Sequence, residues 1–509
     1  MKYFSLFISL LSIPTLLLGQ MNTSLISQLN YDAPVNDIWG YVATDSTEYA
    51  IVGLQNGVSV VSLADASTPV EVGFAPGPSS GWRDIKTWET HAYAINETGD
   101  GLLVMDLSML PDTMPYFYWS PQISDLGGQL TTCHNIFIDE FGYAYLAGCN
   151  LNGGGPIFVD VFSEPGNPIY AGKGDARYAH DVYARNNIMY GSDIYVGNFS
   201  VTNVIDKSNP ILIASQPTPF LFTHNTWLSD DGNTLFTTDE RADAPTAAYD
   251  ISNLANIQLL DEFRPAATVG RGVIPHNTHV LNDFLITSHY TDGVVIVDAA
   301  RPSNLIQVGQ YDTFSGPDGG FNGCWGAYPF LPSGVILGSD RESGLFVIEP
   351  TYQRACYLEG LVRSVSSQEV LTGVEVTIES EEDNVTTTDL EGRFATGQVE
   401  SGTFTARFTQ FGYFPKEVEV ELINGEVTEL EILLESERRF SISGQVVNEE
   451  NGGALPNAHL SIVSEEATYE VSTNEDGTFT LEDIVEDEYD VFVGAWGYLY
   501  QTATITPEN

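Results

Sequence analysis

The sequence is poor in basic residues. Lysine and arginine together number 19 against 69 aspartates and glutamates, so the 509-residue chain carries a formal net charge of −50. Proteins that bind nucleic acids neutralise phosphates with clustered lysine and arginine. The composition therefore argues against a nucleic-acid partner. With 43% hydrophobic residues the chain has enough apolar surface for packed cores, and its length suggests about three domains at ~150 residues each.

Long hydrophobic runs are also scarce. One run, residues 3–18, follows the positive charge of Lys2, contains Pro14 and ends before Gly19-Gln20. This arrangement is typical of a secretory signal and is short for a membrane span. We therefore predict a signal peptide at residues 1–20, no transmembrane segment after its cleavage, and an extracellular or outer cell-surface location. The expected partner is then an extracellular protein, a glycan or a small ligand.

Cysteine is rare as well, and the four residues are Cys133, Cys149, Cys324 and Cys356. The oxidising surroundings of an exported protein allow disulfides to form. Four cysteines permit three connectivities. Proximity within the repeats favours Cys133 with Cys149 and Cys324 with Cys356, and the alternative is four buried free thiols.

The sequence has no stretch that keeps the apolar spacing of a helix for long. Its short β-branched and aromatic runs are separated by Gly, Pro, Asn, Asp and Ser, as in strands joined by turns. The predicted fold class is all-β.

Residues 21–352 repeat a short polar motif at intervals of 44 to 52 residues. The seven motifs are Asn36-Asp37, Arg83-Asp84, His134-Asn135, His180-Asp181, His224-Asn225, His276-Asn277 and Asn322-Gly323. Each is followed by short apolar runs that fit four strands, which is typical of a propeller blade. We predict a seven-bladed β-propeller, in which residues 24–31 complete the last blade because that unit supplies only three strands itself.

Three of the apolar runs end in an acidic residue and resemble the LVIVD repeat. They are residues 101–106, 293–298 and 344–349. Their arrangement resembles the choice-of-anchor B family. The resemblance implies an exported bacterial surface protein, of a kind typical of Bacteroidetes and marine bacteria, whose propeller is joined to variable C-terminal anchoring signals. It implies no enzymatic activity.

A second repeat begins after residue 352. Residues 353–509 hold 32 acidic and 7 basic residues, and three pairs of segments match one another. The pairs are 360–362 with 444–447, 388–394 with 473–479, and 411–413 with 496–498. The pattern resembles the carboxypeptidase regulatory-like domain, a small β-sandwich that is common as a spacer in secreted bacterial proteins.

The resemblance predicts two sandwiches, at residues 353–436 and 437–509. The second lacks the continuation that the first has at 427–435, which predicts a truncated domain. The turns at 389–392 and 474–477 lack the full set of oxygen ligands of a calcium loop, so we expect no calcium there. No zinc-binding His/Glu set with metalloprotease spacing accompanies the two domains.

Four consecutive repeats open with a histidine: His134, His180, His224 and His276. The opening strand of a propeller blade lies nearest the axis, so these side chains should gather near one mouth of the channel. The second strand runs back to the same rim, and the residues at its end should join them. These residues are Asp193, Asp239, His289 and Asp340, with Glu240 beside Asp239.

Imidazoles and carboxylates together suit a divalent transition metal such as Zn, Fe, Mn or Cu. Four propeller histidines also resemble the iron ligands of carotenoid-cleaving oxygenases, although here they lie on consecutive blades in unrelated sequence. The alternative interpretation is structural. Each histidine, with the Asp or Asn that follows it, would then cap a strand by bonding to neighbouring backbone.

The sequence thus supports a hypothesis of an exported surface or secreted binding module with spacer domains. The alternative is a metal-dependent enzyme or metal-binding protein that uses the histidines, and a third class is a purely structural envelope component. Catalytic residues cannot be assigned, and no organic cofactor is indicated. A hydrolase elbow has no support, because no Gly-x-Ser-x-Gly lies between a strand and a helix.

Overall fold

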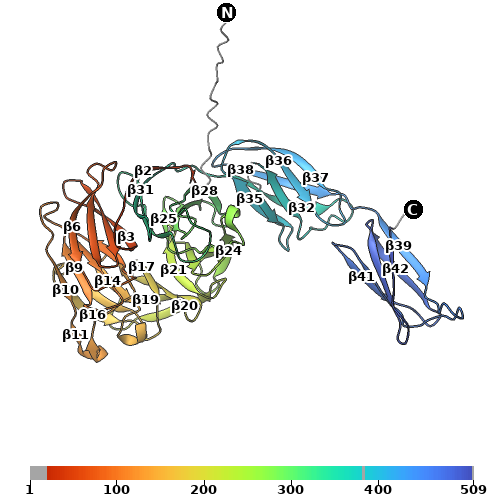
Figure 1. Ribbon diagram of the computed structural model, residues 1–509, viewed down its shortest axis with the longest axis horizontal. Helices are drawn as coiled ribbons and strands as arrows, with labels where there is room; N and C mark the ends of the chain where they lie inside the picture. Colours follow the sequence, from red (N-terminus) through yellow and green to blue (C-terminus); the bar gives the residue numbers. More distant parts are fainter. Residues whose placement is uncertain (1–19, 381–383, 507–509) are drawn as a thin grey trace, which may run out of the picture. The chain divides into compact units, whose positions relative to one another are not determined.

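A computed structural model describes residues 20–380 and 384–506. In these ranges the regular structure is strand, apart from 3₁₀ turns at Ser124–Leu126, Asn152–Gly154 and Ala266–Thr268, which confirms the all-β prediction. The chain divides into one unit that ends at Ala355 and a second that starts at Cys356 (Figure 1). Residues 1–19, which hold most of the predicted signal peptide, lie outside the described residues.

The described residues of the first unit form seven sheets built around four antiparallel strands each (Figure 1). The first contains β3 (Val35–Val42), β4 (Glu48–Leu54), β5 (Gly57–Ser62) and β6 (Val70–Pro76), and the second contains β7 (Ile85–Trp88), β8 (His91–Ala94), β9 (Leu102–Asp106) and β10 (Tyr116–Trp119). The third contains β13 (Asn135–Ile138), β14 (Tyr143–Ala147), β15 (Ile157–Asp160) and β16 (Ile169–Lys173), and the fourth contains β17 (Asp181–Arg185), β18 (Ile188–Asp193), β19 (Asn198–Asn203) and β20 (Ile211–Pro217). The fifth contains β21 (Thr223–Leu228), β22 (Thr234–Asp239), β23 (Thr246–Asp250) and β24 (Gln258–Phe263), and the sixth contains β25 (Thr278–Leu281), β26 (Phe284–Ser288), β27 (Val294–Asp298) and β28 (Ile306–Tyr311). A small hairpin, β11 (Gln122–Ile123) with β12 (Gly128–Gln129), lies between the second and third sheets in the sequence.

Segments from both ends of the unit share the seventh sheet. It combines β29 (Cys324–Tyr328), β30 (Ile336–Asp340) and β31 (Gly344–Pro350) with the early strand β2 (Thr23–Leu29). Ser24 lies opposite Glu349 and Leu29 opposite Leu345. The short β1 (Gln20–Met21) pairs with β28 of the sixth sheet. The first strand of each sheet contacts the first strand of the sheet that follows it along the chain, and β29 of the seventh sheet contacts β3 of the first. The first and seventh sheets are therefore neighbours.

Burial explains why the middle strands have continuous apolar sequences. Strand β27 is buried at every position, whereas the outer strand β20 is largely exposed. Each sheet packs face to face on its neighbours, so both faces of a middle strand are covered, and alternation of apolar and polar residues is lost. One core cluster, for example, joins Ile51 and Val60 of the first sheet to Ala92 and Leu103 of the second.

The second residue of the repeated motif links neighbouring sheets. In four places its side-chain oxygen accepts a hydrogen bond from a backbone N–H in the first strand of the next sheet. The donors are Ile85 to Asp37 (3.1 Å), Ile136 to Asp84 (3.0 Å), Val182 to Asn135 (3.1 Å) and Thr278 to Asn225 (3.1 Å). Each bond is buried, where an unpaired amide would cost roughly 1–3 kcal/mol.

We predict that Asn225→Ala lowers the free energy of unfolding by about 2–3 kcal/mol, because it removes the acceptor of the Thr278 amide and the donor to Asp181. Urea unfolding followed by tryptophan fluorescence measures the change. Asn209→Ala, in an exposed outer turn, is the control and should change stability by less than about 0.5 kcal/mol. Equal effects of the two substitutions would contradict a structural role for the link between sheets.

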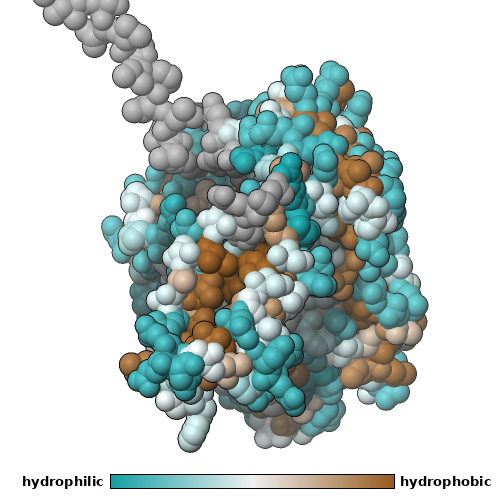
Figure 2. Space-filling view, turned by 90° about the vertical axis from the view of Figure 1, so that its right-hand side faces the viewer, coloured by the Kyte–Doolittle hydropathy of each residue, from teal (hydrophilic) through white to brown (hydrophobic). Residues whose placement is uncertain are grey.

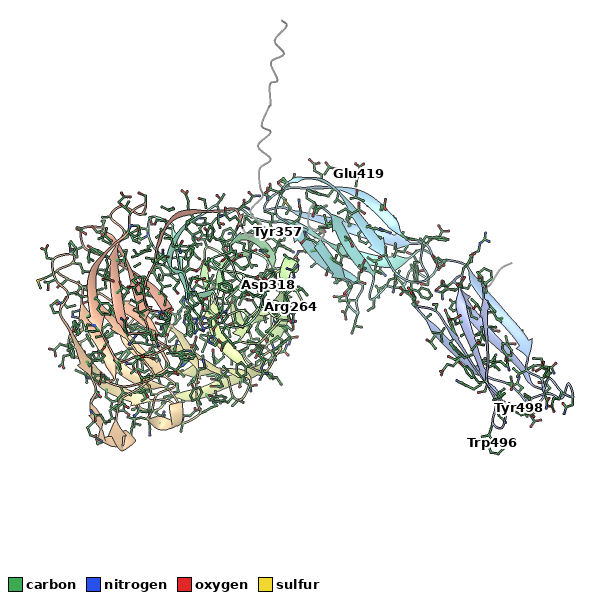
Figure 3. All side chains as sticks on the ribbon, in the orientation of Figure 1. Arg264, Asp318, Tyr357, Glu419, Trp496 and Tyr498 are labelled. Atoms are coloured by element: carbon green, nitrogen blue, oxygen red, sulfur yellow. A yellow bond between two sulfur atoms is a disulfide. The ribbon has the colours of Figure 1, made fainter. Side chains whose placement is uncertain are left out.

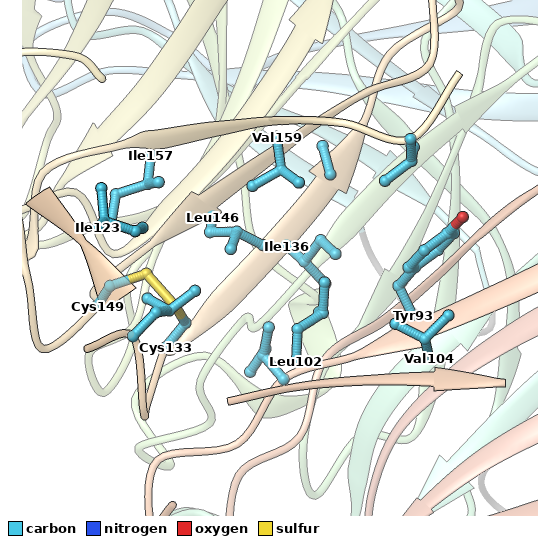
Figure 4. Packing of buried hydrophobic residues seen from close by; sticks show 14 residues of the cluster. Tyr93, Leu102, Val104, Ile123, Cys133, Ile136, Leu146, Cys149, Ile157 and Val159 are labelled. Atoms are coloured by element: carbon cyan, nitrogen blue, oxygen red, sulfur yellow. A yellow bond between two sulfur atoms is a disulfide. The ribbon is translucent and has the colours of Figure 1, made fainter. Parts of the chain in front are cut away.

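Cys133 and Cys149 form a disulfide beside the third sheet (Figure 4). Their side chains pack with Ile123, Leu146 and Ile157 in one buried cluster. The bridge closes a short loop, which limits the conformations of the unfolded chain and stabilises the fold by roughly 3 kcal/mol.

The structure does not contain the predicted second pairing, because Cys324 and Cys356 are both free and buried. Cys324 starts β29 and its thiol lies 3.4 Å from the Gly326 carbonyl oxygen. Cys356 starts the first strand of the following unit, where its sulfur lies 3.8 Å from the Ser401 hydroxyl. Each thiol is thus enclosed by its own sheet. Burial raises the pKa of both thiols.

Alkylation of the unfolded, unreduced chain should modify two thiols, and mass mapping should place them at Cys324 and Cys356. Reduction before alkylation should add Cys133 and Cys149. Modification of no thiol, or of four, without reduction would contradict the observed pairing.

The second unit contains two sandwiches, each described here by itself. The first has sheets β35-β32-β38 and β34-β33-β36-β37, in which β32 and β38 are parallel. Its strands are β32 (Cys356–Ser364), β33 (Glu375–Glu379), β34 (Asn384–Thr387), β35 (Arg393–Gln398), β36 (Gly402–Thr409), β37 (Lys416–Leu422) and β38 (Val427–Leu434). Strand β37 shows the alternation of a sheet with one wet face: Val420 and Leu422 enter the core, while Glu419 points outward (Figure 3).

The second sandwich has sheets β39-β42 and β41-β40-β43-β44. Its strands are β39 (Arg439–Gln445), β40 (His459–Val463), β41 (Thr468–Ser472), β42 (Thr478–Val485), β43 (Tyr489–Gly494) and β44 (Gln501–Ile505). Its first sheet has two strands where that of the other sandwich has three, counting described residues only. Its core cluster is correspondingly small and includes Ile462, Ile484 and Tyr489.

Hydrophilic residues cover much of the face seen in Figure 2, with hydrophobic patches between them. Exposed aromatic residues contribute to the surface of the second sandwich. Trp496 is 99% exposed and Tyr498 is 49% exposed (Figure 3).

Among the described residues, no helix has the length and hydrophobicity that crossing a lipid bilayer requires.

Candidate ligand site on the innermost strands

Four imidazoles form a continuous row across four neighbouring sheets. The ring centroids of His134 and His180 are 3.9 Å apart, those of His180 and His224 are 4.3 Å apart, and those of His224 and His276 are 4.4 Å apart. Each histidine lies within two residues of the start of the first strand of its sheet. The backbone N–H groups of His180 and His276 bond to Ser192 and Ser288 of the adjacent second strands, which fixes the two positions.

The two histidines at the ends of the row have strong partners. His134 Nδ1 lies 2.6 Å from Glu97 Oε1. Burial opposes protonation of His134, but the bond to Glu97 and the charge of Asp181 outweigh it and raise the pKa of the ring. At the other end, His276 Nδ1 lies 2.5 Å from the Trp325 carbonyl oxygen. An imidazole must donate to a carbonyl oxygen, so Nδ1 of His276 carries the proton in this arrangement.

The two central histidines have fewer partners. His224 Nδ1 is buried without a hydrogen-bond partner, and His180 Nδ1 lies 3.3 Å from Asp181 Oδ1 without hydrogen-bond geometry. Burial and the neighbouring imidazoles lower the pKa of His180 to about 4. Burial also lowers the pKa of His224 to about 4, despite the opposing charge of Asp181. Both rings are therefore neutral at pH 7 and have lone pairs available.

Glu240 faces the centre of the row from the end of β22. Its Oε2 lies 3.9 Å from His224 Nε2, and its Oε1 lies 3.9 Å from His276 Nε2. The Tyr290 hydroxyl donates to Oε1 at 2.7 Å and holds the carboxylate in place. Burial raises the pKa of Glu240.

Two overlapping groups in the described residues bring their ligand atoms within 4.8 Å of one another. One contains His134, His180 and Asp181, and the other contains His180, His224 and Glu240. Both have the nitrogen and oxygen atoms that divalent transition metals bind. They share His180, at the centre of the row.

His276 and the other predicted residues lie in neither group, and each contacts other residues. Asp193 Oδ2 lies 3.2 Å from Arg177 Nε. Asp239 accepts bonds from the Thr218 hydroxyl and the backbone of 220 and 222, while Asp340 accepts them from Thr313 and the backbone of 342 and 343. His289 Nδ1 lies 3.4 Å from Asp292.

The two residues of the motif have different roles. The second residue accepts the bonds between sheets, and the first residue, where it is histidine, forms the imidazole row. The structural interpretation of the sequence gave one role, the capping of a strand, to each histidine together with the Asp or Asn that follows it. In the structure the Asp or Asn makes four backbone links between sheets, and His276 makes one through the Trp325 carbonyl, whereas the neighbouring imidazoles of His180 and His224 lie against each other. Sequence reasoning named Glu240 but gave no role to Glu97 or Tyr290. Glu97 lies outside the repeated motif, so no periodic signal marks it.

The row has an aromatic border. The Trp325 ring lies 4.8 Å from His276, and Trp82 meets it edge-on at 5.7 Å. Phe321 meets Tyr290 edge-on at 5.5 Å. Trp82 is 41% exposed and Phe321 is 50% exposed. Polar atoms inside and exposed aromatic rings outside are the common composition of a binding surface.

Comparison with known proteins identifies the domains of the second unit. Residues 358–439 match the CarboxypepD_reg-like domain and residues 441–509 match the Carboxypeptidase regulatory-like domain. The prediction of two carboxypeptidase regulatory-like domains is therefore confirmed. No curated protein matches the sequence.

Solved structures similar to the chain include a "putative 6-phosphogluconolactonase" from Bacteroides uniformis. The identity is 12% and the TM-score 0.42, over 52% of this chain and 82% of that one. Another is the Cps50 (Swd1) β-propeller domain of Myceliophteria thermophila, at 10% identity and a TM-score of 0.45, over 64% of this chain and 99% of that one.

We predict that Asp193 makes the protein less stable as pH rises from about 4 to about 7. Burial raises the pKa of Asp193 to about 7, from 3.8 in an exposed chain. Between these values the folded state keeps a proton that the unfolded state has lost, so stability falls with pH. Asp193→Asn should remove about 1–4 kcal/mol of this decline.

Urea midpoints of the two proteins at pH 4.5 and pH 8 measure the difference. Asp112→Asn, at an exposed turn, should leave the pH dependence as in the unchanged protein. If Asp193→Asn gives the same decline as the unchanged protein, Asp193 is ionised in the fold and the prediction is wrong.

Proposed function

We propose that the protein is an exported bacterial surface or secreted binding module. The propeller binds an extracellular protein, glycan or small ligand at the end that carries the imidazole row, and the two sandwiches are spacer domains. Carboxypeptidase regulatory-like domains at the C-terminal end, and the apolar N-terminal segment after Lys2, support the exported location. The LVIVD-like runs support membership of the choice-of-anchor B family as part of the same proposal.

The observation that carries the binding role is the row of imidazoles with unused polar atoms. Buried polar groups in folded proteins are nearly all hydrogen-bonded, so exceptions call for an explanation. His224 Nδ1 is such an exception at the centre of the row. A ligand that bonds to these atoms would recover the free energy that their burial costs.

The border of the row favours a partner with flat or ring-shaped apolar surface. Trp82 and Phe321 expose their rings beside Trp325 and Tyr290. Aromatic rings of this kind pack against sugar faces and apolar side chains while the polar atoms fix orientation. With a net charge of −50, the chain would repel strongly anionic partners.

The test uses the full chain, recovered after export and screened on an array of glycans and an array of extracellular proteins. We expect binding to at least one member, and a loss of more than tenfold in affinity for Trp82→Ala with Phe321→Ala. Phe162→Ala, which removes another exposed ring, is the control and should bind normally. Intact mass should show that the exported chain begins at Met21.

Two results would contradict the proposal. One is that the folded protein binds no member of either array. The other is that Phe162→Ala weakens binding as much as the double substitution does, because the border residues would then have no specific role.

A further inference from the structure

The two candidate groups in the imidazole row differ in how their members are bonded to the rest of the fold. In the group of His134, His180 and Asp181, His134 is bonded to Glu97, and Asp181 accepts a bond from Asn225 at 3.3 Å. That carboxylate therefore belongs to the polar contacts between sheets. In the second group, His180, His224 and Glu240, the carboxylate uses one oxygen, Oε1, to accept a bond from Tyr290, which follows β26 of the next sheet.

The surroundings of the second group hold its members in place. Tyr290 donates to Glu240 Oε1, which leaves Oε2 facing His224 Nε2 at 3.9 Å. The hydroxyl thus orients the carboxylate without occupying the second oxygen. Groups that hydrogen-bond to a ligand in this way are a regular feature of metal sites, where they fix the direction of the lone pairs.

The burial of the group also favours a cation. The His224 side chain is 3% exposed and that of Glu240 is 16% exposed. Among the described residues, the basic side chains that lie close to the Glu240 carboxylate are the imidazoles of His224 and His276, and no lysine or arginine pairs with it. A buried carboxylate next to neutral imidazoles lacks a compensating charge, and a divalent ion would supply it.

We propose that His180, His224 and Glu240 form a binding site for one divalent transition-metal ion. Two imidazoles and one carboxylate favour Zn²⁺, Mn²⁺, Fe²⁺ or Co²⁺ over Ca²⁺ and Mg²⁺, which prefer oxygen ligands. Three protein ligands leave a coordination position for a donor atom from outside the group. This inference builds on the proposed function, since the metal would lie where the propeller binds its partner.

The experiment uses the exported full chain, purified without an affinity-tag metal, stripped with chelator and titrated with Zn²⁺ and with Co²⁺. We expect about one ion per chain and a visible Co²⁺ absorption band that chelator removes. His180→Ala and His224→Ala should each weaken metal binding by at least 100-fold. Glu240→Gln should weaken it by about 10–100-fold and alter the Co²⁺ spectrum.

His91→Ala is the matched control, because His91 is a partly buried propeller histidine in β8, bonded to Thr90 and outside the row. It should leave metal binding unchanged. His180→Gln, which keeps a polar side chain of similar length, provides a second variant if His180→Ala does not fold. Circular dichroism establishes folding in each case.

The inference is overturned if the folded, unchanged protein binds less than a stoichiometric amount of either ion. Retention of full affinity by folded His180→Ala or His180→Gln would overturn it too. The array experiment separates this result from the proposed function. Partner binding by chelated protein would support the binding module without a metal, and metal binding without a partner would support the metal site alone.

Discussion

A buried hydrogen bond between neighbouring sheets is the interaction on which the propeller depends. A side-chain oxygen at the start of one innermost strand accepts an N–H from the innermost strand of the next sheet, as Asn135 does for Val182. In the described residues no sheet ladder crosses the boundary between the sheets of Asn135 and Val182, because each of these sheets pairs its own strands. Apolar packing alone is non-directional. The hydrogen bond supplies direction, and its repetition at four boundaries orients those sheets relative to one another.

Because of the same bond, histidines at the first motif position remain available for the candidate site. Since Asp and Asn at the second motif position link sheets, the imidazoles of His180 and His224 are not needed for that purpose and can face each other. Rigid strands then set the spacing of the row at about one imidazole per sheet, with centroids 3.9 to 4.4 Å apart. A site on the strands of a stable scaffold is positioned more accurately than one on loops. Burial, in turn, keeps His180 and His224 neutral.

Periodic features of the sequence predicted the structure well, and solitary ones did not. The repeated motifs anticipated the sheets, and the shared first position anticipated that His134 to His276 would lie together. Asp193 and Asp340 were expected beside them, yet the structure bonds these carboxylates to Arg177 and Thr313 instead. Chain position gives the strand on which a residue lies. The direction of its side chain depends on which partners lie nearby, and Arg177 and Thr313 lie in the connections between sheets.

The sequence by itself determined the all-β class, the repeat and the two C-terminal domains, because alternation, turn residues and repeat length are local properties of the chain. Only the tertiary structure decided that Glu97 and Tyr290 bond to members of the site and that Cys324 and Cys356 are each buried as free thiols. These contacts join residues from separate parts of the chain. Their distances follow from how the sheets pack, and no local pattern in the sequence encodes them.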